Sequence, residues 1–312
     1  MRTIQVEAPG LLTTVQDLGR PGYGTLGVSE SGAADPVALR LGNRLVGNQE
    51  NAAGLEMTLL GATFTFSERM IVALTGSDFG ATLDGHVVPL WTSFAVAAGQ
   101  KLKVGSTRTG ARCYLCVQGG IVVKMFLGSA STHLMSGLGG LDGRPLRKGD
   151  ALTVGPARPN FRHKRVADEI LEQVALRKTL RVTDGPQCDW FSVSAQNLFL
   201  TTTYRVTEEA NRMGLRLEGA PLPGSSNGPM ITEGVPLGAV QIPSGGQPII
   251  LFVEQQTTGG YPKIANIIAA DMAGVGQLRP RDEVRFERVA IQDARNALVK
   301  LEKLLASELL TV

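Results

Sequence analysis

Long apolar runs, cysteines and aromatic residues are all scarce in this sequence of 312 residues. The longest apolar segments, such as Pro248 to Val253 and Ile264 to Ala270, fall far short of the roughly 18 residues that a membrane-spanning helix needs. Three cysteines cannot build a disulfide framework. The start of the chain lacks the hydrophobic stretch of a secretory signal peptide. Together these absences argue against a membrane protein and favour the cytoplasm.

An excess of charge of one sign is missing too. Lysine and arginine number 31 and aspartate and glutamate number 28, which leaves a formal net charge of +3. Because the charges are spread along the whole chain, a surface that follows a phosphate backbone is not expected. The three histidines, His86, His133 and His163, lack the spacing of metal ligands. The composition therefore argues against a nucleic-acid-binding protein and gives no support for a metal site.

Glycine and proline, in contrast, are abundant, with 38 and 16 residues. Short apolar segments separated by Gly-rich turns recur about every 8–12 residues, which is typical of barrels and sandwiches. The sequence therefore predicts a mainly β fold with a few helices. The expected strands are Thr3–Glu7, Leu55–Leu60, Thr63–Phe66, Met70–Thr75, Arg112–Val117, Leu200–Val206, Ile249–Val253 and Glu283–Phe286.

Three helices are expected among these strands. The first has Asp35 as its N-cap and Pro36 at its first helical position, and it ends at Gly47-Asn48, so both ends carry the usual signals. The other two are predicted from helical spacing of apolar residues: one begins near Pro262 and carries Ile264, Ile267, Ile268 and Met272, and one begins near Ala290 and carries Ala294, Leu298, Leu301 and Leu305. The last is amphipathic and is expected to dock on a sheet.

Proline and charge gather near the middle of the chain, from Gly155 to Thr179. This composition predicts an N-terminal half over 1–157, a linker over 158–180 and a C-terminal half over 181–312. Each half contains a related phrase, LRKGD before ALTV in the first and LRPRD before EVRF in the second. An internal duplication would produce this likeness, and so would a turn that an Asp closes before an alternating strand.

Familiar motifs occur without the context that they need. The GxGxxG string from Gly22 to Gly27 stands well before the nearest expected helix, so a dinucleotide would find no helix N-terminus. Cys113 and Cys116 spell CxxC in an expected strand, where residues three apart face opposite sides and cannot share a metal. Lys124-Met125 matches half of the Met-Lys-Met tip that carries biotin, and an ordinary exposed lysine is the better interpretation.

Four polar clusters remain that are unusual for plain connectors. Amide, carboxylate and guanidinium groups can bind a planar amide or a carboxylate by paired hydrogen bonds, whereas glycines and hydroxyls near a helix N-terminus favour negative charge. Turn closure and helix capping would use the same residue types, so both alternatives stay open. The clusters are Thr14 to Arg20, Gly128 to Thr132, Asn211 to Gly214 and Glu254 to Pro262.

Specific strings stand in a fixed order along the chain: TVQDLGR, YLCVQGG, LGSAST, GPQCDWF, NRMGLRLEG and QTTGGY. In this order they resemble the biotin-dependent carboxyltransferase family, also described as allophanate-hydrolase-subunit-2-like. The resemblance runs from about Val6 to about Phe286, which is nearly the full chain. It implies two cyclophilin-like β-barrel halves and a partner similar to allophanate hydrolase subunit 1.

The resemblance also implies one of two chemistries. One is an ATP-dependent 5-oxoprolinase complex that opens 5-oxo-L-proline to L-glutamate, in which the subunit-1-like partner is the B-type member and an A-type protein is the third member. The other is carboxyl transfer from biotin to urea or another small amide. The family further includes regulators that bind a subunit-1-like kinase inhibitor without catalysis. The length of the chain favours the hydrolase, with ATP bound at a site not located on this chain and no covalent biotin.

Site residues follow from the matching motifs. Gln16, Arg20 and Arg212 are predicted to orient the amide. Gln255, Thr257 and the N–H groups near Gly259 and Gly260 would stabilise developing oxyanion charge. The full catalytic set is Gln16, Asp17, Arg20, Arg212, Gln255, Thr257 and Tyr261, and the substrate-binding set is Ser129, Ser131, Glu233, Gly259 and Gly260. No residue in the sequence identifies a nucleophile or a general base.

Overall fold

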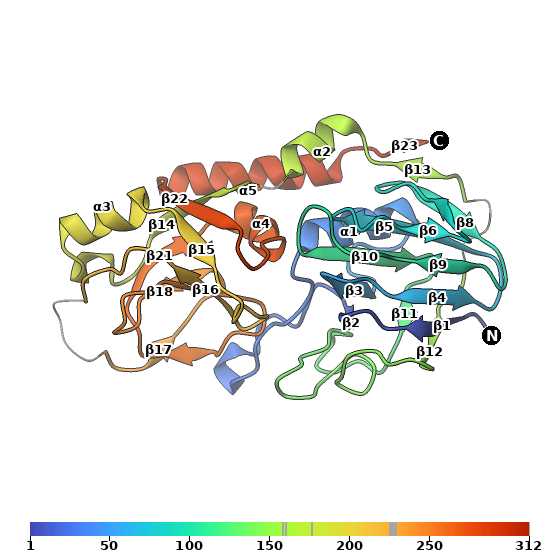
Figure 1. Ribbon diagram of the computed structural model, residues 1–312, viewed down its shortest axis with the longest axis horizontal. Helices are drawn as coiled ribbons and strands as arrows, with labels where there is room; N and C mark the ends of the chain where they lie inside the picture. Colours follow the sequence, from blue (N-terminus) through green and yellow to red (C-terminus); the bar gives the residue numbers. More distant parts are fainter. Residues whose placement is uncertain (158, 160, 176, 225–229, 312) are drawn as a thin grey trace. The chain divides into compact units, whose positions relative to one another are not determined.

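The computed structural model describes residues 1–157, 159, 161–175, 177–224 and 230–311 (Figure 1). Contacts divide the chain into two compact units, unit 1 with Met1–Arg20, Ser31–Ala175 and Leu305–Val312, and unit 2 with Pro21–Glu30 and Leu176–Leu304. Residues 158, 160 and 176 of the predicted linker lie outside the described residues. The rest of the linker includes strand β13 (Lys164–Arg165) and helix α2 (Asp168–Val174).

Unit 1 contains two sheets. The larger has the strand order β11-β12-β1-β4-β9-β6-β7, and the smaller has the order β2-β3-β10-β5-β8. The strands are β1 (Thr3–Ala8), β2 (Leu12–Gln16), β3 (Gly54–Thr58), β4 (Thr63–Phe66), β5 (Met70–Gly76), β6 (Thr82–Leu83), β7 (His86–Val87), β8 (Ser93–Val96), β9 (Lys101–Lys103), β10 (Arg112–Val117), β11 (Ile121–Val122) and β12 (Ala151–Val154). A separate pair joins β13 to β23 (Leu310–Thr311).

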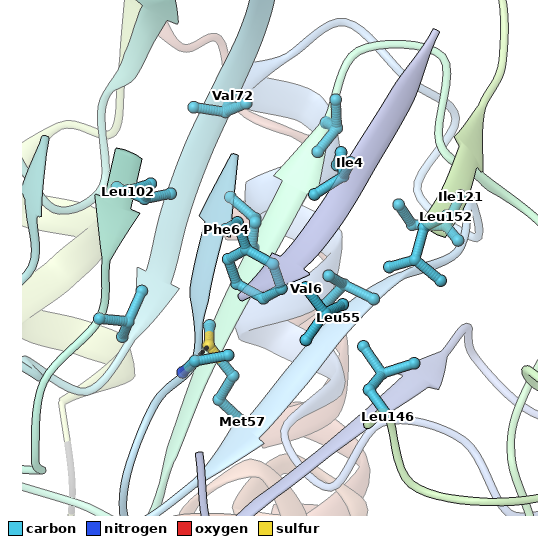
Figure 2. Close-up of a cluster of buried hydrophobic side chains, with 14 of the residues drawn as sticks. Ile4, Val6, Leu55, Met57, Phe64, Val72, Leu102, Ile121, Leu146 and Leu152 are labelled. Atoms are coloured by element: carbon cyan, nitrogen blue, oxygen red, sulfur yellow. Dashed lines mark hydrogen bonds between the residues drawn. The ribbon is translucent and has the colours of Figure 1, made fainter. Parts of the chain in front are cut away.

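The two sheets of unit 1 enclose one hydrophobic core. Strand β1 alternates buried and partly exposed residues, so Ile4 and Val6 point inward. Figure 2 shows them beside Phe64 of the same sheet and Leu55 and Met57 of the other sheet. Burial of a side chain of this size contributes about 1.5–3 kcal/mol. This core holds the ends of β2 and β10, from which polar residues follow.

Helix α1 (Pro36–Leu45) agrees with its prediction. The Asp35 side chain accepts a hydrogen bond from the Ala38 N–H at 2.9 Å, and Pro36 occupies the first turn. Val37 and Leu41 are buried along one face. The predicted strands Thr63–Phe66 and Arg112–Val117 are confirmed to the residue.

Unit 2 is built around a closed barrel with the strand order β14-β21-β18-β19-β16-β15-β22, drawn from yellow to red in Figure 1. Strands β14 and β22 close it as a parallel pair. The barrel strands are β14 (Thr179–Asp184), β15 (Tyr204–Val206), β16 (Gly214–Glu218), β18 (Ala239–Gln241), β19 (Ile249–Leu251), β21 (Lys263–Ile267) and β22 (Glu283–Arg288). The chain is therefore mainly β with a few helices, as predicted.

Short elements surround the barrel: α3 (Val193–Thr201), α4 (Met272–Gly276), the antiparallel pair of β17 (Glu233–Gly234) with β20 (Thr258–Gly259), and the 3-10 turns η1 (Gly24–Leu26), η2 (Cys188–Trp190) and η3 (Ala269–Asp271). The Phe199 ring of α3 stacks on Phe286 of β22 with centroids 4.5 Å apart. Of the helices that the described residues form, none has the length and hydropathy that a membrane crossing requires.

Two predictions were wrong in unit 2. The helix expected from Pro262 is strand β21, because Lys263–Ile267 pairs with β14 on one side and β18 on the other. Ile264, Ile267 and their neighbours have helical spacing, but such short apolar runs fit a buried strand equally well. The strand expected over Leu200–Val206 is divided between the end of α3 and β15, since Ser192 caps the helix by accepting from the Ala195 N–H.

Helix α5 (Ile291–Ala306) forms where it was predicted. Its predicted docking on a sheet is not supported. Leu305 is the buried residue of this helix, all of which is described, whereas Leu298 and Val299 are exposed. Amphipathic spacing predicts the helix but does not predict how much of its apolar face is covered.

The two related phrases form the same turn. In unit 1 the Asp150 carboxylate accepts from the Arg147 N–H at 2.7 Å. The Val6 N–H donates to the Asp150 carbonyl at 2.9 Å, and the Gly149 N–H donates to the Val6 carbonyl at 2.9 Å. Gly149 has a left-handed backbone with φ of 93°.

The turn of unit 2 repeats each of these bonds. The Asp282 carboxylate accepts from the Arg279 N–H at 2.8 Å. The Val206 N–H donates to the Asp282 carbonyl at 3.0 Å, and the Arg281 N–H donates to the Val206 carbonyl at 2.7 Å. Arg281 has a φ of 73°, so a residue with a side chain takes the left-handed position that glycine holds in unit 1.

Candidate functional site

The predicted site residues fall into two groups, one in each unit. The first, which we call the Asp17 cluster, contains Gln16, Asp17, Arg20, Ser129 and Ser131. The Asp17 carboxylate is buried, and its Oδ1 accepts from Ser129 Oγ at 2.6 Å and from Ser131 Oγ at 2.5 Å. The Gly19 N–H donates to Oδ1 at 2.8 Å, and the Ala130 N–H donates to Oδ2 at 2.6 Å. Four donors therefore satisfy this carboxylate.

Gln16 is completely buried beside it. Its Nε2 donates to Thr14 Oγ1 at 3.0 Å and to the Thr132 carbonyl at 3.1 Å. Within the described part of the chain, its Oε1 has no hydrogen-bond partner. The Gln16 amide is therefore fixed in orientation by its nitrogen.

Arg20 is 1% exposed, and its side chain is held by main-chain oxygens. The guanidinium donates to the Ser131 carbonyl and to the Phe126 carbonyl, and it lies 5.6 Å from the centre of the Phe126 ring. Gly139 packs against this contact, because a Cβ there would stand 2.1 Å from the Ser131 carbonyl oxygen and 2.9 Å from Arg20 Nη2. Phe126 and Gly139 also line a cavity of about 360 Å³ formed with β11 and β12. The orienting role predicted for Arg20 stays a prediction.

Arg212 and Glu254 form a buried ion pair in unit 2. They are 4% and 3% exposed, and Arg212 Nε donates to Glu254 Oε1. The Glu254 N–H also donates to the Arg212 carbonyl at 2.8 Å. Because the charge of the Arg212 guanidinium is balanced inside the protein, the pair holds the start of the QQTTGGY segment in place.

The second group, which we call the Lys263 cluster, contains Glu233, Gln241, Gln255, Gly259 and Lys263. Lys263 is completely buried, and its Nζ lies 2.5 Å from Glu233 Oε1. The bonds from Lys263 and then from Gln187 Nε2, at 2.9 Å, lower the pKa of the Glu233 carboxyl. The Glu233 side chain is 45% exposed, so the pair joins a buried ammonium group to the surface.

Sequence reasoning missed Lys263 and Gln241. The two residues lie opposite each other in the β18–β21 pair, where the register shifts at a β-bulge. Bulges often redirect side chains beside functional sites. Treating Pro262 as the start of a strand would have placed Lys263 on an alternating pattern with Ala265 and Ile267, and an inward lysine in such a pattern is a signal of function.

The structure brings several predicted residues of unit 2 together. Glu233 pairs with Gly259 where β17 and β20 run antiparallel, and the Val235 N–H donates to the Thr257 carbonyl at 3.1 Å. Gln255 Nε2 donates to the Val235 carbonyl at 2.9 Å. Tyr261 is half exposed. The segment after Pro262 is described as a strand and so offers no helix N-terminus, and any oxyanion stabilisation here would come from side chains and strand N–H groups.

Cys113 and Cys116 are buried on the two faces of strand β10. Cys113 belongs to the core of unit 1, whereas Cys116 lies on the other side of β10 with its Sγ 3.8 Å from the Leu39 carbonyl of α1. The prediction that they face opposite sides is confirmed. Burial raises the pKa of the Cys113 thiol to about 12, so it is an inert core residue.

A family model described as "Carboxyltransferase domain, subdomain A and B" matches residues 26–288. This chain belongs to that family. The C subunit of the 5-oxoprolinase of Escherichia coli is 38% identical over 296 residues, which cover 94% of each chain. The chain therefore matches a relative of nearly its own length.

Larger relatives contain the same domain. The urea amidolyase of Saccharomyces cerevisiae is 32% identical over 311 residues, but the match covers only 17% of that protein. The crystal structure of the K. lactis urea amidolyase superimposes with a TM-score of 0.91 at 31% identity, covering 97% of this chain and 20% of the other. The fold of the two units is thus the fold of a carboxyltransferase domain.

Proposed function

We propose that this chain belongs to an ATP-dependent 5-oxoprolinase complex, to which it contributes amide binding and charge stabilisation. The observation that carries the proposal is the end-to-end match with the C subunit of a 5-oxoprolinase. The complex would convert 5-oxo-L-proline, ATP and water to L-glutamate, ADP and phosphate. Its other members would be a subunit-1-like protein of the B type and a third protein of the A type, working together in the cytoplasm.

Opening a lactam makes two demands on the site. Negative charge develops on the carbonyl oxygen, and the ring nitrogen must gain a proton to leave as an amine. Lys263 is a proton donor at the right kind of position, because its ammonium group is buried but is linked to the half-exposed Glu233. We assign Lys263 the proton transfer to nitrogen and Glu233 the return of the proton from solvent.

The roles predicted from the sequence are kept in this proposal, except that Gln255 contributes a different atom. Within unit 2, Arg212 orients the amide or its anionic intermediate, and Thr257, Gly259, Gly260 and Tyr261 border the reacting group. The amide-orienting role of Gln16 and Arg20 in unit 1 stays a prediction. Because Gln255 Nε2 is already bound to the Val235 carbonyl, the atom that Gln255 can offer is its Oε1 acceptor. Asp17, Ser129 and Ser131 act as the support of Gln16 and Arg20.

ATP would bind on a partner protein. The polar groups of this chain fit an amide better than a triphosphate, because each cluster combines carboxylates with amides and its cations are held by carboxylates or main-chain oxygens. No covalent biotin is expected at Lys124, which lies in an exposed segment.

The second candidate is carboxyl transfer to urea or another small amide. It is favoured by the similarity to urea amidolyases in sequence and in fold. Urea shares the planar amide of 5-oxoproline, so the same donors and acceptors would serve. In that case a biotin-bearing partner would have to deliver the carboxyl group.

The experiment that tests the proposal uses this chain co-purified with its subunit-1-like partner and the A-type partner. ATP hydrolysis and glutamate release are measured with 5-oxo-L-proline, with urea and without substrate. We expect both products to rise only with 5-oxo-L-proline. A complex that forms but hydrolyses no ATP with this substrate would reject the proposal in favour of another amide or of a regulatory role.

A further inference from the structure

Two amide side chains of unit 2, Gln241 and Gln255, each have one buried hydrogen-bonding atom without a partner among the described residues. Gln241 is 1% exposed, and its Oε1 accepts from Gln256 Nε2 at 3.4 Å. Its Nε2 finds no partner among residues 1–157, 159, 161–175, 177–224 and 230–311. A buried N–H without a partner destabilises the fold, so this group points to a ligand that supplies an acceptor.

The space beside this nitrogen is kept open by glycine. A Cβ on Gly259 would lie 2.7 Å from Gln241 Nε2. The φ angle of Gly259 is outside the left-handed region, so the backbone does not require glycine there. The absence of a side chain at Gly259 therefore serves the space next to the Gln241 amide.

Gln255 supplies the complementary atom. Its Nε2 donates to the Val235 carbonyl, and its buried Oε1 has no partner in the described part of the chain. Val235 also contacts the Gly259 position, with its Cγ1 3.4 Å from where a Cβ would stand. The unused donor of Gln241 lies against the Gly259 position, and the unused acceptor belongs to Gln255, which is bonded to Val235 beside the same position.

A donor and an acceptor that meet the same ligand match one edge of a cis amide. In a lactam or a cyclic urea the N–H and the C=O lie on the same edge, whereas the trans amide of a peptide places them on opposite edges. We propose that Gln241 Nε2 and Gln255 Oε1 bind the N–H/C=O edge of a cis amide beside Lys263. This inference rests on the proposed function and deepens it, because it names the chemical feature that selects the substrate.

The test measures binding without ATP. Small rings are titrated by ligand-detected NMR into the full chain, alone and co-purified with its partners. 2-Pyrrolidinone and 2-imidazolidinone keep the cis N–H/C=O edge, N-methyl-2-pyrrolidinone blocks the N–H, and γ-butyrolactone replaces it. We expect the first two to bind at least about tenfold more tightly than the last two, since each lost hydrogen bond leaves a buried atom unsatisfied.

Matched glycine variants locate the site. Gly259→Ala places a methyl group against Gln241 Nε2, whereas at Gly234, on the paired strand, a Cβ would meet nothing within 4 Å. We expect Gly259→Ala to weaken 2-pyrrolidinone binding about tenfold and Gly234→Ala to leave it unchanged. Gln241→Leu should weaken the binding of all four rings, since each keeps the C=O, whereas Gln255→Leu should abolish the preference for the N–H rings. Urea unfolding verifies that each variant is folded.

The outcomes separate the two proposals. Equal binding of the N-methyl ring, or a folded Gly259→Ala variant that binds normally, would overturn the cis-amide inference even if the complex hydrolyses ATP with 5-oxo-L-proline. Selective binding in a complex without that hydrolysis would keep the inference and reject the 5-oxoprolinase function. Absence of binding in both the free chain and the complex would also overturn the inference.

Discussion

The Asp17 cluster and the Lys263 cluster use the same kinds of side chains in opposite ways. Around Asp17, two main-chain N–H groups and two hydroxyls satisfy one buried carboxylate. Around Lys263, Gln241 Nε2 and Gln255 Oε1 are unsatisfied by the described residues, and Glu233 reaches the surface. The difference teaches that the bonding state of each group matters more than its residue type: the Asp17 carboxylate is fully bonded, whereas Gln16 Oε1 beside it, like the two amide atoms near Lys263, has no partner among the described residues.

The largest effect is expected at Asp17. Asp17→Ala leaves four donors without an acceptor in a buried place, so we expect the free energy of unfolding to fall by about 3 kcal/mol or more. Asp17→Asn should cost less, because it keeps the shape and one acceptor. The measurement is urea unfolding, with Asp168→Ala on the exposed first turn of α2 as a control that stays near wild type. A loss below about 1 kcal/mol in Asp17→Ala would show that the cluster is not a support.

At Lys263 we expect a large effect on activity and a small effect on stability. Lys263→Met keeps the volume and removes the charge, and its partner Glu233 is exposed enough to be hydrated, so unfolding should change little. Activity of the complex should fall by about 100-fold if Lys263 transfers a proton. Lys300→Met on exposed helix α5 is the control. An active, folded Lys263→Met variant would remove Lys263 from the mechanism.

The paired turns sharpen the comparison between units. Gly149→Arg puts a side chain at a φ of 93° with no atom in the way, so the cost is conformational, about 1 kcal/mol. Arg281→Gly relieves the same strain and should be neutral to stabilising by up to about 1 kcal/mol, since the ion pair of Arg281 with Glu208 is exposed. Thermal unfolding tests both variants: the melting temperature should fall in Gly149→Arg and should stay unchanged or rise in Arg281→Gly. A fall in both variants, or a rise in both, would contradict the prediction.

The smallest effect concerns pH. The folded-state pKa of Glu233 lies below the ordinary value of 4.5, so its contribution to stability is present above that value and is lost as the pH falls through the lowered pKa. The difference in melting temperature between wild type and Glu233→Gln should therefore be constant near neutral pH and shrink in acid. If the difference in melting temperature instead grows as the pH falls, the pKa of Glu233 is raised in the folded state and the prediction is wrong.

Local signals predicted the parts of the fold that depend on neighbours in sequence. Helix α1 was predicted from Asp35 and Pro36, and strands β4 and β10 from short apolar patterns. The segment after Pro262 was missed because its apolar spacing fits both a helix and a strand, and only pairing with β14 and β18 decides between them. Such pairing involves residues far away in the chain.

The candidate site was predicted as motifs but not as networks. The strings TVQDLGR and QTTGGY located both clusters. The full set of hydrogen bonds to the Asp17 carboxylate, however, depends on Ser131, which is 114 residues away in the sequence. Lys263 was overlooked because a lysine next to an expected helix start is usually hydrated. Burial of its ammonium group became evident only when β21 took its place in the barrel.

Closure of the barrel has a consequence for handling the protein at high concentration. The barrel has no free edge, and the seven-stranded sheet ends on both sides in the two-residue strands β11 and β7. Unpaired edges are the usual templates for aggregation between chains, and such short ones offer little to bind. The barrel and the seven-stranded sheet are thus protected from β-sheet polymerisation by the way they end, and the longer edge strands β2 and β8 of the five-stranded sheet are where such pairing would begin.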